Sequence, residues 1–328
     1  MDSYRAAIIG CGRIGAFFDA PASDSVLTHA RAYTTHPRTH LCAVMDTDGE
    51  KAASAGRIWG CAYYTDIDDL FHHEKLDIVS VCTPTVNHYS ILIDLVRFRP
   101  QAVIAEKPLT DKTDLSQEIV NLYASKGIPL FVNYPRRYDP VLQRVRYDIL
   151  NKKFGAVLYA VIIYTKGILH NGSHAVDLCH FLFGDLHKSI ALWGRYDYSA
   201  EDPTISASLS FDRCPNVIFI AADERCYSIF DFEIACEMRK IRFENFGFEY
   251  REDVVRDDPT FSEYHDLKKT RYRRTGLHKA MLGLVDNVVK YLERDDQILC
   301  SGADAHLAQI VCENLIKTYN GSHARVID

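Results

Sequence analysis

Long apolar runs and an excess of basic residues are both missing from this chain of 328 residues. No stretch approaches the roughly 18 consecutive apolar residues that a membrane-spanning helix needs, so no membrane span is expected. The opening stretch MDSYRAAIIG has no charged segment followed by a long apolar one, so no signal peptide is expected. Lys and Arg total 38 against 44 for Asp and Glu, a net charge of -6. We therefore expect no nucleic-acid partner, because such partners usually require a concentrated basic surface.

Closely spaced cysteine pairs are missing too, since the ten cysteines include no C-x-x-C spacing. Several of them, such as Cys11, Cys42 and Cys82, lie in apolar strand-like or turn contexts. This distribution favours buried, reduced thiols in a cytoplasmic protein over a disulfide framework. The chain does contain 47% hydrophobic and 11% aromatic residues, enough for ordinary packed cores, and its length predicts two domains.

The first 135 residues alternate short apolar runs with helical stretches. The segment DLSQEIVNLYASKG predicts a helix that is capped by Thr113 or Asp114 and ends at Gly127. Continuous apolar runs are typical of parallel strands that are buried on both faces. Strand and helix in alternation therefore predict a doubly wound, parallel α/β domain over residues 1–135. The expected strands are 4–10, 40–46, 77–85, 102–108 and 128–134.

The pattern changes beyond about residue 150. Apolar runs follow one another with short connections such as DRCPN, which favour hairpins and a mostly antiparallel sheet in a second domain over 136–328. One helix is expected among the strands, at 172–183, and helices at 276–294 and 303–319 close the chain. The expected strands are 156–165, 189–199, 204–212, 216–222 and 228–238.

A glycine motif follows the first expected strand. Gly10, Gly12 and Gly15 form a G-x-G-x-x-G with Arg13 and Ile14 inside it. The first glycine permits a tight turn, the second lets a pyrophosphate approach the backbone, and the third lets the next helix pack closely. A plain glycine turn is the alternative, but the position between strand and helix predicts a dinucleotide site in a Rossmann domain.

Asp46 ends the second expected strand, in AVMDTD. A carboxylate there accepts hydrogen bonds from the adenosine ribose hydroxyls and repels a 2′-phosphate, which favours NAD over NADP. Asp46 lies 31 residues after Gly15, farther than the usual spacing of roughly 20. We attribute the extra length to a loop, FFDAPASDS, inserted before the helix around LTHARAYTTH. A solvated turn aspartate remains the alternative.

Two further segments follow expected strands, and the carboxyl ends of parallel strands share one ligand crevice. One is Thr83-Pro84-Thr85-Val86-Asn87-His88, and the other contains Glu106 and Lys107. Burial can lower the pKa of a lysine beside a cofactor, which could then exchange a proton with a substrate hydroxyl. The alternative for Lys107 is an exposed lysine in a turn.

The stretch LHNGSHAVDLCHF contains His170, His174, Asp177 and His180. Two histidines and a carboxylate can bind a metal. However, a helix capped by Asn171 or Ser173 leaves His170 outside it, and no H-E-x-x-H pattern is present. We therefore expect no metal. His174 lies in the first helical turn, where the helix dipole favours a neutral imidazole able to transfer a proton. Helix packing explains Asp177 and His180 better. Lys166 precedes this stretch and is either a ligand for a substrate carboxylate or phosphate, or an exposed strand-end lysine.

The chain resembles the Gfo/Idh/MocA oxidoreductases in five segments, which in order are GCGRIG, AVMD, TPTVNH, AEKPLT and GSHAVDL. The resemblance implies an NAD(P)-binding Rossmann domain (1–135) followed by a domain for substrate binding and oligomerisation (136–328). That second domain is expected to be an open, mostly antiparallel sheet with helices on one face. The resemblance also implies a nicotinamide cofactor (NAD, with NADP possible), a sugar, nucleotide-sugar or cyclitol substrate, and a homodimer or homotetramer formed through the C-terminal sheet.

The same resemblance implies roles for single residues. Lys107 matches a lysine that contacts both cofactor and substrate hydroxyl, and His174 matches a histidine that helps to transfer the substrate proton. His170 stands where many members carry aspartate, so its catalytic role is open. The expected function is an NAD(P)-dependent oxidoreductase; the alternatives are a non-catalytic NAD-binding sensor and a metal-dependent hydrolase or lyase that uses His170, His174 and Asp177. The residues expected to line the cofactor are Gly10, Gly12, Arg13, Ile14, Gly15, Asp46, Thr83, Pro84, Asn87, His88, Glu106 and Lys107.

Overall fold

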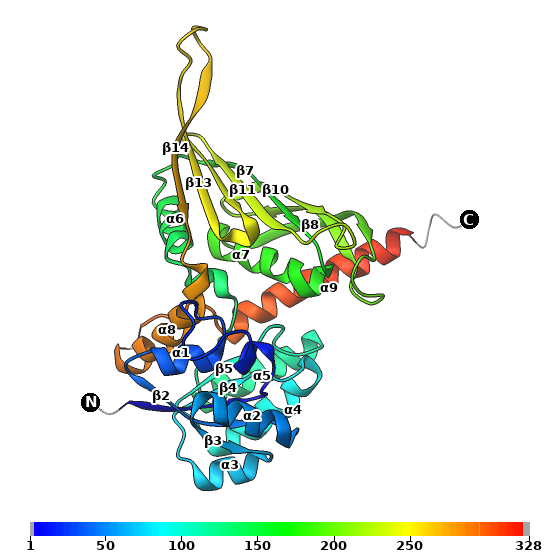
Figure 1. Ribbon diagram of the computed structural model, residues 1–328. Helices are drawn as coiled ribbons and strands as arrows, with labels where there is room; N and C mark the ends of the chain where they lie inside the picture. Colours follow the sequence, from blue (N-terminus) through cyan, green and yellow to red (C-terminus); the bar gives the residue numbers. More distant parts are fainter. Residues whose placement is uncertain (1–2, 295, 324–328) are drawn as a thin grey trace. The chain divides into compact units, whose positions relative to one another are not determined.

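The computed structural model describes residues 3–294 and 296–323, which divide into two compact units. Unit 1 contains Met1–Tyr138 and His278–His306, and unit 2 contains Asp139–Leu277 and Leu307–Asp328. The expected fold class is confirmed, because unit 1 holds a parallel sheet and unit 2 a mostly antiparallel one (Figure 1). Within the described residues, no helix is both long enough and apolar enough to cross a membrane.

Six parallel strands form the sheet of unit 1 in the order β3-β2-β1-β4-β5-β6. This is the doubly wound order in which the direction of strand addition reverses beside β1, so a crevice opens at the carboxyl ends of β1 and β4. All five predicted strands are present; β3 escaped prediction because it has three residues, none of them buried. The strands are β1 (Tyr4–Ile9), β2 (Thr39–Met45), β3 (Ala62–Tyr64), β4 (Ile78–Val81), β5 (Ala102–Ala105) and β6 (Leu130–Val132).

The α-helices of unit 1 follow the strands, and α5 shows what the sequence could and could not predict about their ends. The helix ends at the left-handed Gly127, as predicted. Its N-cap is Lys112 without a side-chain hydrogen bond, so the predicted cap at Thr113 or Asp114 is wrong. The helices are α1 (His29–Thr35), α2 (Gly49–Trp59), α3 (Ile67–His73), α4 (His88–Phe98), α5 (Thr113–Lys126) and α8 (Ala280–Arg294).

The chain returns to unit 1 near its C-terminal end. The sequence analysis placed all of 136–328 in a second domain, whereas the structure groups residues 278–306 with the parallel sheet. This segment contains α8 and the start of α9 (Gly302–His323). Polar contacts join α8 to the segment before β2: Arg38 Nη1 forms an ion pair with Glu293 Oε1 at 2.7 Å, and His36 Nε2 lies 3.5 Å from Asp286 Oδ1. Contacts so distant in sequence leave no local signal, so the sequence pattern did not reveal this return.

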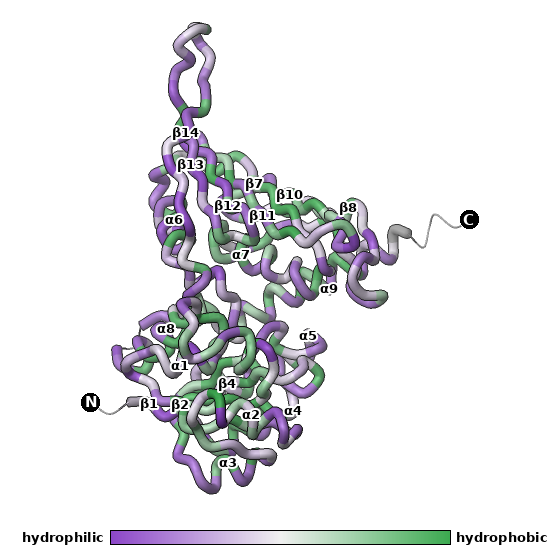
Figure 2. The backbone as a smooth tube through the Cα atoms, viewed as in Figure 1, coloured by the Kyte–Doolittle hydropathy of each residue, from purple (hydrophilic) through white to green (hydrophobic). Residues whose placement is uncertain are grey.

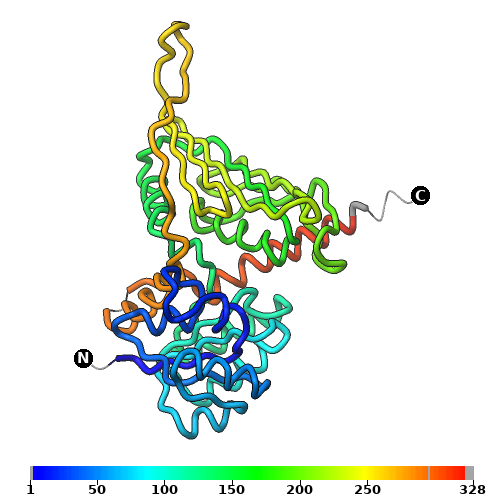
Figure 3. Tube along the Cα trace, in the orientation of Figure 1, coloured from blue at the N-terminus to red at the C-terminus, as the bar shows by residue number. Residues whose placement is uncertain are grey.

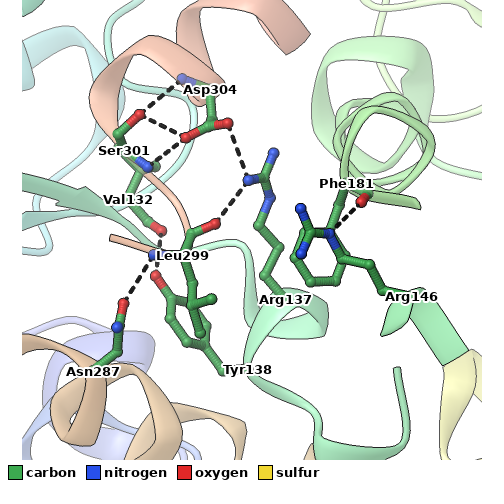
Figure 4. A network of polar contacts seen from close by, with 9 residues as sticks. All are labelled: Val132, Arg137, Tyr138, Arg146, Phe181, Asn287, Leu299, Ser301 and Asp304. Atoms are coloured by element: carbon green, nitrogen blue, oxygen red, sulfur yellow. Dashed lines mark hydrogen bonds and ion pairs between the residues drawn. The ribbon is translucent and has the colours of Figure 1, made fainter. Parts of the chain in front are cut away.

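Arg137 is the central contact of the returning segment (Figure 4). Its Nη1 donates to the Leu299 carbonyl at 2.7 Å and to Asp304 Oδ1 at 3.0 Å, and its side chain is only 5% exposed. Burial alone favours the protonated form of Asp304, but Arg137 and the hydrogen bonds from Ser301 outweigh it and hold the pKa of Asp304 below its ordinary value. The two ends of unit 1 are therefore joined by a largely buried ion pair.

An eight-stranded sheet forms unit 2 in the order β14-β13-β12-β11-β7-β10-β9-β8. Only β7 and β10 pair in parallel, and all other neighbours are antiparallel. The five predicted strands correspond to β7 to β11. The strands are β7 (Val157–Tyr164), β8 (Leu186–Arg195), β9 (Thr204–Phe211), β10 (Cys214–Ala221), β11 (Phe230–Cys236), β12 (Arg239–Glu244), β13 (Glu249–Asp257) and β14 (His265–Arg274).

Strands β12 to β14 escaped prediction because they lack continuous apolar runs. Their sequences are RKIRFE, EYREDVVRD and HDLKKTRYRR, in which charged residues alternate with others or dominate. The hairpin of β13 and β14 extends beyond the other strands as a narrow arm (Figures 1 and 3). Figure 2 shows that this arm is mainly polar, whereas apolar segments concentrate in central strands such as β10.

Three α-helices accompany this sheet. Helix α6 (Pro140–Leu150) was not predicted, although Asp139 caps it by accepting hydrogen bonds from the backbone N–H groups of Val141 and Leu142. Helix α7 (Ser173–Phe183) confirms the helix expected at 172–183, and Phe183 packs on Phe211 of β9 with ring centroids 6.4 Å apart. The C-terminal part of α9 is the third helix.

We expect Arg137→Met to lower the free energy of unfolding of unit 1 by about 2 kcal/mol, because Asp304 Oδ1 and the Leu299 carbonyl lose the hydrogen bonds that Arg137 donates. Urea unfolding at neutral pH measures the change. The control is Arg97→Met, whose exposed ion pair with Asp68 should contribute less than about 1 kcal/mol.

The same variant should respond to acid in a defined direction. Because the folded-state pKa of Asp304 lies below 3.8, its contribution to stability is present above that pH and is lost as the pH falls through the folded-state pKa. The difference between wild type and Arg137→Met should therefore shrink below about pH 4. A difference that stays constant as the pH falls well below 4 would show that the charge of Asp304 contributes nothing to it.

Candidate functional site

A cavity of 640 Å³ opens at the carboxyl ends of β1, β2 and β4 in unit 1. This is the crevice where the strand order reverses, the usual ligand position in doubly wound sheets. The cavity lies entirely within unit 1. Half of the predicted cofactor residues line it: Gly10, Gly12, Asp46, Thr83, Pro84 and Asn87.

The three motif glycines differ in what surrounds them. A Cβ on Gly10 would lie 2.6 Å from the Cys82 carbonyl carbon, and a Cβ on Gly15 would overlap the carbonyl oxygen of Gly10. These two glycines therefore permit close packing inside the domain. A Cβ on Gly12 would meet nothing closer than the Cys82 carbonyl oxygen at 3.9 Å. Gly12 thus leaves open space on the cavity side, where a ligand can approach the backbone.

The segment after the motif is not a long regular helix. Residues Arg13–Phe17 form a short π-helical turn, and α1 begins only at His29, so the inserted loop predicted before that helix is confirmed. The exposed Arg13 places its guanidinium carbon 5.2 Å from the Phe18 ring centroid. Neither Arg13 nor Ile14 lines the cavity.

Asp46 is held firmly at the cavity wall. Its Oδ2 accepts a hydrogen bond from the backbone N–H of Cys11 at 2.8 Å, and its Oδ1 accepts one from the N–H of Asp48 at 2.9 Å. Lys51 is a cation of the lining, but its ammonium lies 3.2 Å from Asp48 Oδ2, and this contact raises the pKa of Lys51. The fixed carboxylate therefore has lone pairs for hydroxyl donors, and the cation beside it is already neutralised.

The segment after β4 supplies the opposite wall. Thr83 lines the cavity, and its buried Oγ1 has no hydrogen-bond partner among the residues that the structure describes. Such an atom usually meets a ligand or water. His88 is 1% exposed and does not line the cavity; its ring nitrogens lie 2.9 Å from the Thr83 carbonyl oxygen and 3.0 Å from that of Pro108. His88 thus ties the ends of β4 and β5 together.

A chain of buried polar groups surrounds Glu106 at the end of β5. Asn133 donates to Glu106 Oε1 at 2.6 Å, and His29 Nε2 lies 3.0 Å from the same oxygen. His29 Nδ1 lies 2.9 Å from Ser80 Oγ, which in turn lies 2.6 Å from the Tyr33 hydroxyl. His29, Ser80 and Tyr33 are fully buried. These groups connect α1, β4, β5 and the segment after β6.

The charge on Glu106 follows from these contacts. Burial favours its protonated form, but the hydrogen bonds from His29 and Asn133 and the charge of Lys107 outweigh it and lower the pKa of Glu106. Glu106 is therefore an ionised carboxylate at neutral pH, directly beside the half-buried Lys107. The sequence analysis missed His29 and Ser80; the only local signal was a polar residue within an otherwise apolar run, as in IVSV.

In unit 2 the histidines of LHNGSHAVDLCHF have separate aromatic neighbours. The exposed His170 lies on Tyr198 with centroids 5.0 Å apart, whereas the half-buried His174 meets Phe230 edge-on at 6.4 Å. No three His, Cys, Asp or Glu side chains in the described part of the chain form a metal-binding group, so His170, His174 and Asp177 are not gathered as ligands.

The start of α7 also differs from the prediction. Gly172 is the N-cap, no side chain caps it, and Ser173 Oγ donates to the Leu169 carbonyl at 2.7 Å, so the predicted cap at Asn171 or Ser173 is wrong. His170 does precede α7, as expected, in a π-helical turn (Gly167–Gly172).

The backbone N–H of His170 donates to Asp202 Oδ2 at 2.9 Å, so a carboxylate from another segment fixes this turn. Just before the turn, the Lys166 ammonium lies 3.1 Å from Glu224 Oε1. Lys166 is therefore held in place by a partner from its own unit.

Comparison with known proteins now adds to this geometry. Residues 4–134 match the GFO_IDH_MocA family, described as an oxidoreductase family with an NAD-binding Rossmann fold. Over these residues the chain therefore has the NAD-binding Rossmann domain of the Gfo/Idh/MocA oxidoreductases. This match agrees with the predicted resemblance and with NAD as the cofactor.

Similar proteins extend the likeness beyond this domain. Inositol 2-dehydrogenase of Rhizobium meliloti is 24% identical over 96% of this chain and 97% of its own length. D-apiose dehydrogenase of Paraburkholderia graminis is 25% identical, but the match spans 58% of this chain and about half (53%) of that relative. An Agrobacterium radiobacter oxidoreductase, crystallised with NAD+, L-tartaric acid and magnesium, shares the fold, with a TM-score of 0.79, 17% identity and coverage of 98% and 97%.

Two alanine substitutions should separate binding from packing in the glycine motif. We expect Gly12→Ala to fold with an unchanged melting temperature but to weaken NADH binding at least about tenfold, because the methyl group fills the open space beside the backbone. Gly15→Ala should instead lower stability by about 1 to 3 kcal/mol through overpacking. Thermal unfolding and fluorescence titration with NADH measure the two effects. Unchanged NADH affinity in a folded Gly12→Ala protein would rule out this position for the cofactor.

Proposed function

We propose that the protein is an NAD-dependent dehydrogenase or reductase that acts on a secondary alcohol or ketone of a sugar, a nucleotide sugar or a cyclitol. The observation that carries the proposal is the ionised Glu106, whose side chain is only 12% exposed, beside Lys107 at the same strand edge as the cavity of Gly12 and Asp46. The names of the two curated relatives, inositol 2-dehydrogenase and D-apiose dehydrogenase, support a polyhydroxylated substrate.

The cavity of unit 1 fits a dinucleotide. Gly12 would admit the pyrophosphate, Asp46 would accept hydrogen bonds from the adenosine ribose hydroxyls, and Thr83 would supply an unpaired hydroxyl on the opposite wall. Pro84 and Asn87 would line the nicotinamide side. When bound, the cofactor supplies the hydride chemistry, and the protein orients it.

Lys107 is the proposed proton-transfer residue. Its ammonium group would hold a proton beside the substrate oxygen during reduction, and its free amine would take one from the substrate hydroxyl during oxidation. Glu106 acts through Lys107, because its fixed negative charge stabilises the ammonium form. His29 and Asn133 position Glu106, and His88 positions the two strand-end segments. Glu106, His29, Asn133 and His88 are therefore positioning residues.

In unit 2, His174 is proposed as a second proton-transfer residue, because it is half-buried at the start of α7 and matches the family's histidine. A catalytic role for His170 is weaker, since its exposed ring rests on Tyr198. Lys166 would bind a substrate only by exchanging its contact with Glu224.

A homodimer or homotetramer formed through the C-terminal sheet in the cytoplasm completes the proposal. Exposed apolar side chains on this sheet, such as Leu192 and Ile220, support such an interface.

We expect Lys107→Met to reduce turnover at least about a hundredfold, because the step loses its acid and base, while NADH still binds. Steady-state assays with myo-inositol, D-apiose and UDP-N-acetylglucosamine, together with NADH titration, measure both quantities. The matched control is Lys126→Met, an exposed lysine at the end of α5, which should keep wild-type turnover. Full activity of Lys107→Met would contradict the assignment. Tight NADH binding without turnover of any sugar or cyclitol would favour the non-catalytic sensor.

Cofactor choice can be tested at Asp46. We expect Asp46→Ser to reduce the preference for NADH over NADPH at least about tenfold, because a negative charge near the 2′-phosphate is removed. Titration of both cofactors by fluorescence measures the ratio of the two dissociation constants. Asp111→Ser, at an exposed loop position outside the cavity, is the control. An unchanged ratio in Asp46→Ser would place the ribose elsewhere.

A further inference from the structure

A second cavity, of 670 Å³, lies entirely within unit 2. Helix α6 and the segment after it form one side, and strands β12, β13 and β14 form the other. Its charges are unbalanced, with five cationic side chains around two carboxylates, in a protein whose net charge is -6. The cations are Arg144, Lys153, Arg239, Arg271 and Arg273, and the carboxylates are Asp148 and Glu252.

The two carboxylates orient the cations. Glu252 accepts a hydrogen bond from the Tyr250 hydroxyl at 2.7 Å and lies 3.0 Å from Arg239 Nη1 and 3.8 Å from Arg271 Nη1. Asp148 lies 2.9 Å from Arg144 Nε. Asp148 Oδ1 makes no hydrogen bond within the described residues, but the Lys153 ammonium lies 3.6 Å from it. Both carboxylates are less than 10% exposed and have cations beside them, which offset their negative charge toward a ligand.

Aromatic rings hold two of the arginines by their faces. The guanidinium carbon of Arg273 lies 5.1 Å from the Tyr250 ring centroid, and that of Arg239 lies 5.9 Å from the Phe154 centroid. Arg273 has no ion pair among the residues that the structure describes. A ring below the guanidinium plane leaves the in-plane N–H donors available, so Arg273 can donate to a ligand in the bidentate manner that phosphate oxygens favour.

The cavity is separate from the segment proposed to transfer protons in unit 2. In the sheet order, β11 stands between β12 and β7. Strand β11 ends at Cys236, which pairs with Val157 at the amino end of β7, and Arg239 of the cavity follows at the start of β12. His174 instead comes after the carboxyl end of β7. The cavity therefore has no residue in common with that segment.

We propose that this cavity binds a diphosphate group. Its volume is that of a small-molecule site, and its excess of three cations matches the charge of a diphosphate better than that of a neutral sugar. Planar, pre-oriented guanidinium groups match the oxygens of phosphates and carboxylates in a bidentate manner, and the excess of three positive charges favours the more highly charged diphosphate. The same chemistry is offered by free pyrophosphate and by the diphosphate of a nucleotide. The proposal does not depend on the substrate of the oxidoreductase.

The experiment is isothermal titration calorimetry of the full-length protein with pyrophosphate, at constant ionic strength and with saturating NADH to fill the cofactor cavity. We expect one pyrophosphate to bind per chain and the double variant Arg271→Gln/Arg273→Gln to weaken it at least about tenfold, with NADH affinity unchanged. The matched control is Arg256→Gln/Arg274→Gln, which removes two cations from the same hairpin but outside the cavity. ADP binding more tightly than pyrophosphate would identify a nucleotide as the source.

Several results would overturn the proposal. They are the absence of pyrophosphate binding, equal binding in both double variants, or inorganic phosphate binding as tightly as pyrophosphate. Binding of poly-glutamate without any binding of pyrophosphate would replace it with an acidic-peptide groove. If the double variant has a lower melting temperature, Arg144→Gln on α6 provides the second test, since it removes a cation from the opposite side of the cavity.

Discussion

The buried carboxylate of Glu106 is the constraint on which the candidate site depends. An ionised carboxylate at a strand end is tolerated away from water only if donors surround it, and here His29 and Asn133 supply them. These donors come from α1 and from the segment after β6. The contacts that offset the cost of removing the Glu106 carboxylate from water therefore also fix the end of β5, and with it Lys107. Ser80 and Tyr33 extend the network into β4 and α1, so the site and the domain core share one set of hydrogen bonds.

The glycine motif illustrates how a short pattern divides into structural and ligand-facing roles. Gly10 and Gly15 are required by contacts within the domain, since a side chain at either would meet backbone atoms. Gly12 has no such requirement and faces the cavity. The motif predicted all three glycines from spacing alone, but only the atoms around each position separate packing from binding.

The two sheets differ in how readily a sequence reveals them. Parallel strands buried on both faces are continuous apolar runs, so β1, β2, β4, β5 and β6 were predictable from local composition. Charged residues dominate strands β12 to β14 or interrupt their apolar residues, so no apolar run marked them. The charged residues of these strands line the cavity of Arg239 and Arg273. The pairing between the strands determines which charged side chains lie side by side there.

The sequence by itself determined the fold class, the dinucleotide motif, the resemblance to a family and the positions of most strands along the chain, because each depends on local spacing or on a run of residues. It also predicted Asp46 and the Glu106–Lys107 pair at strand ends, because parallel strands end at one edge. Only the tertiary structure decided the contacts of Glu106, the return of residues 278–306 to unit 1 and the separate aromatic neighbours of His170 and His174. The physical reason is that a hydrogen bond or an ion pair between residues far apart in the chain, such as Arg137 and Asp304, depends on where folding places them and leaves no mark on the residues around either one.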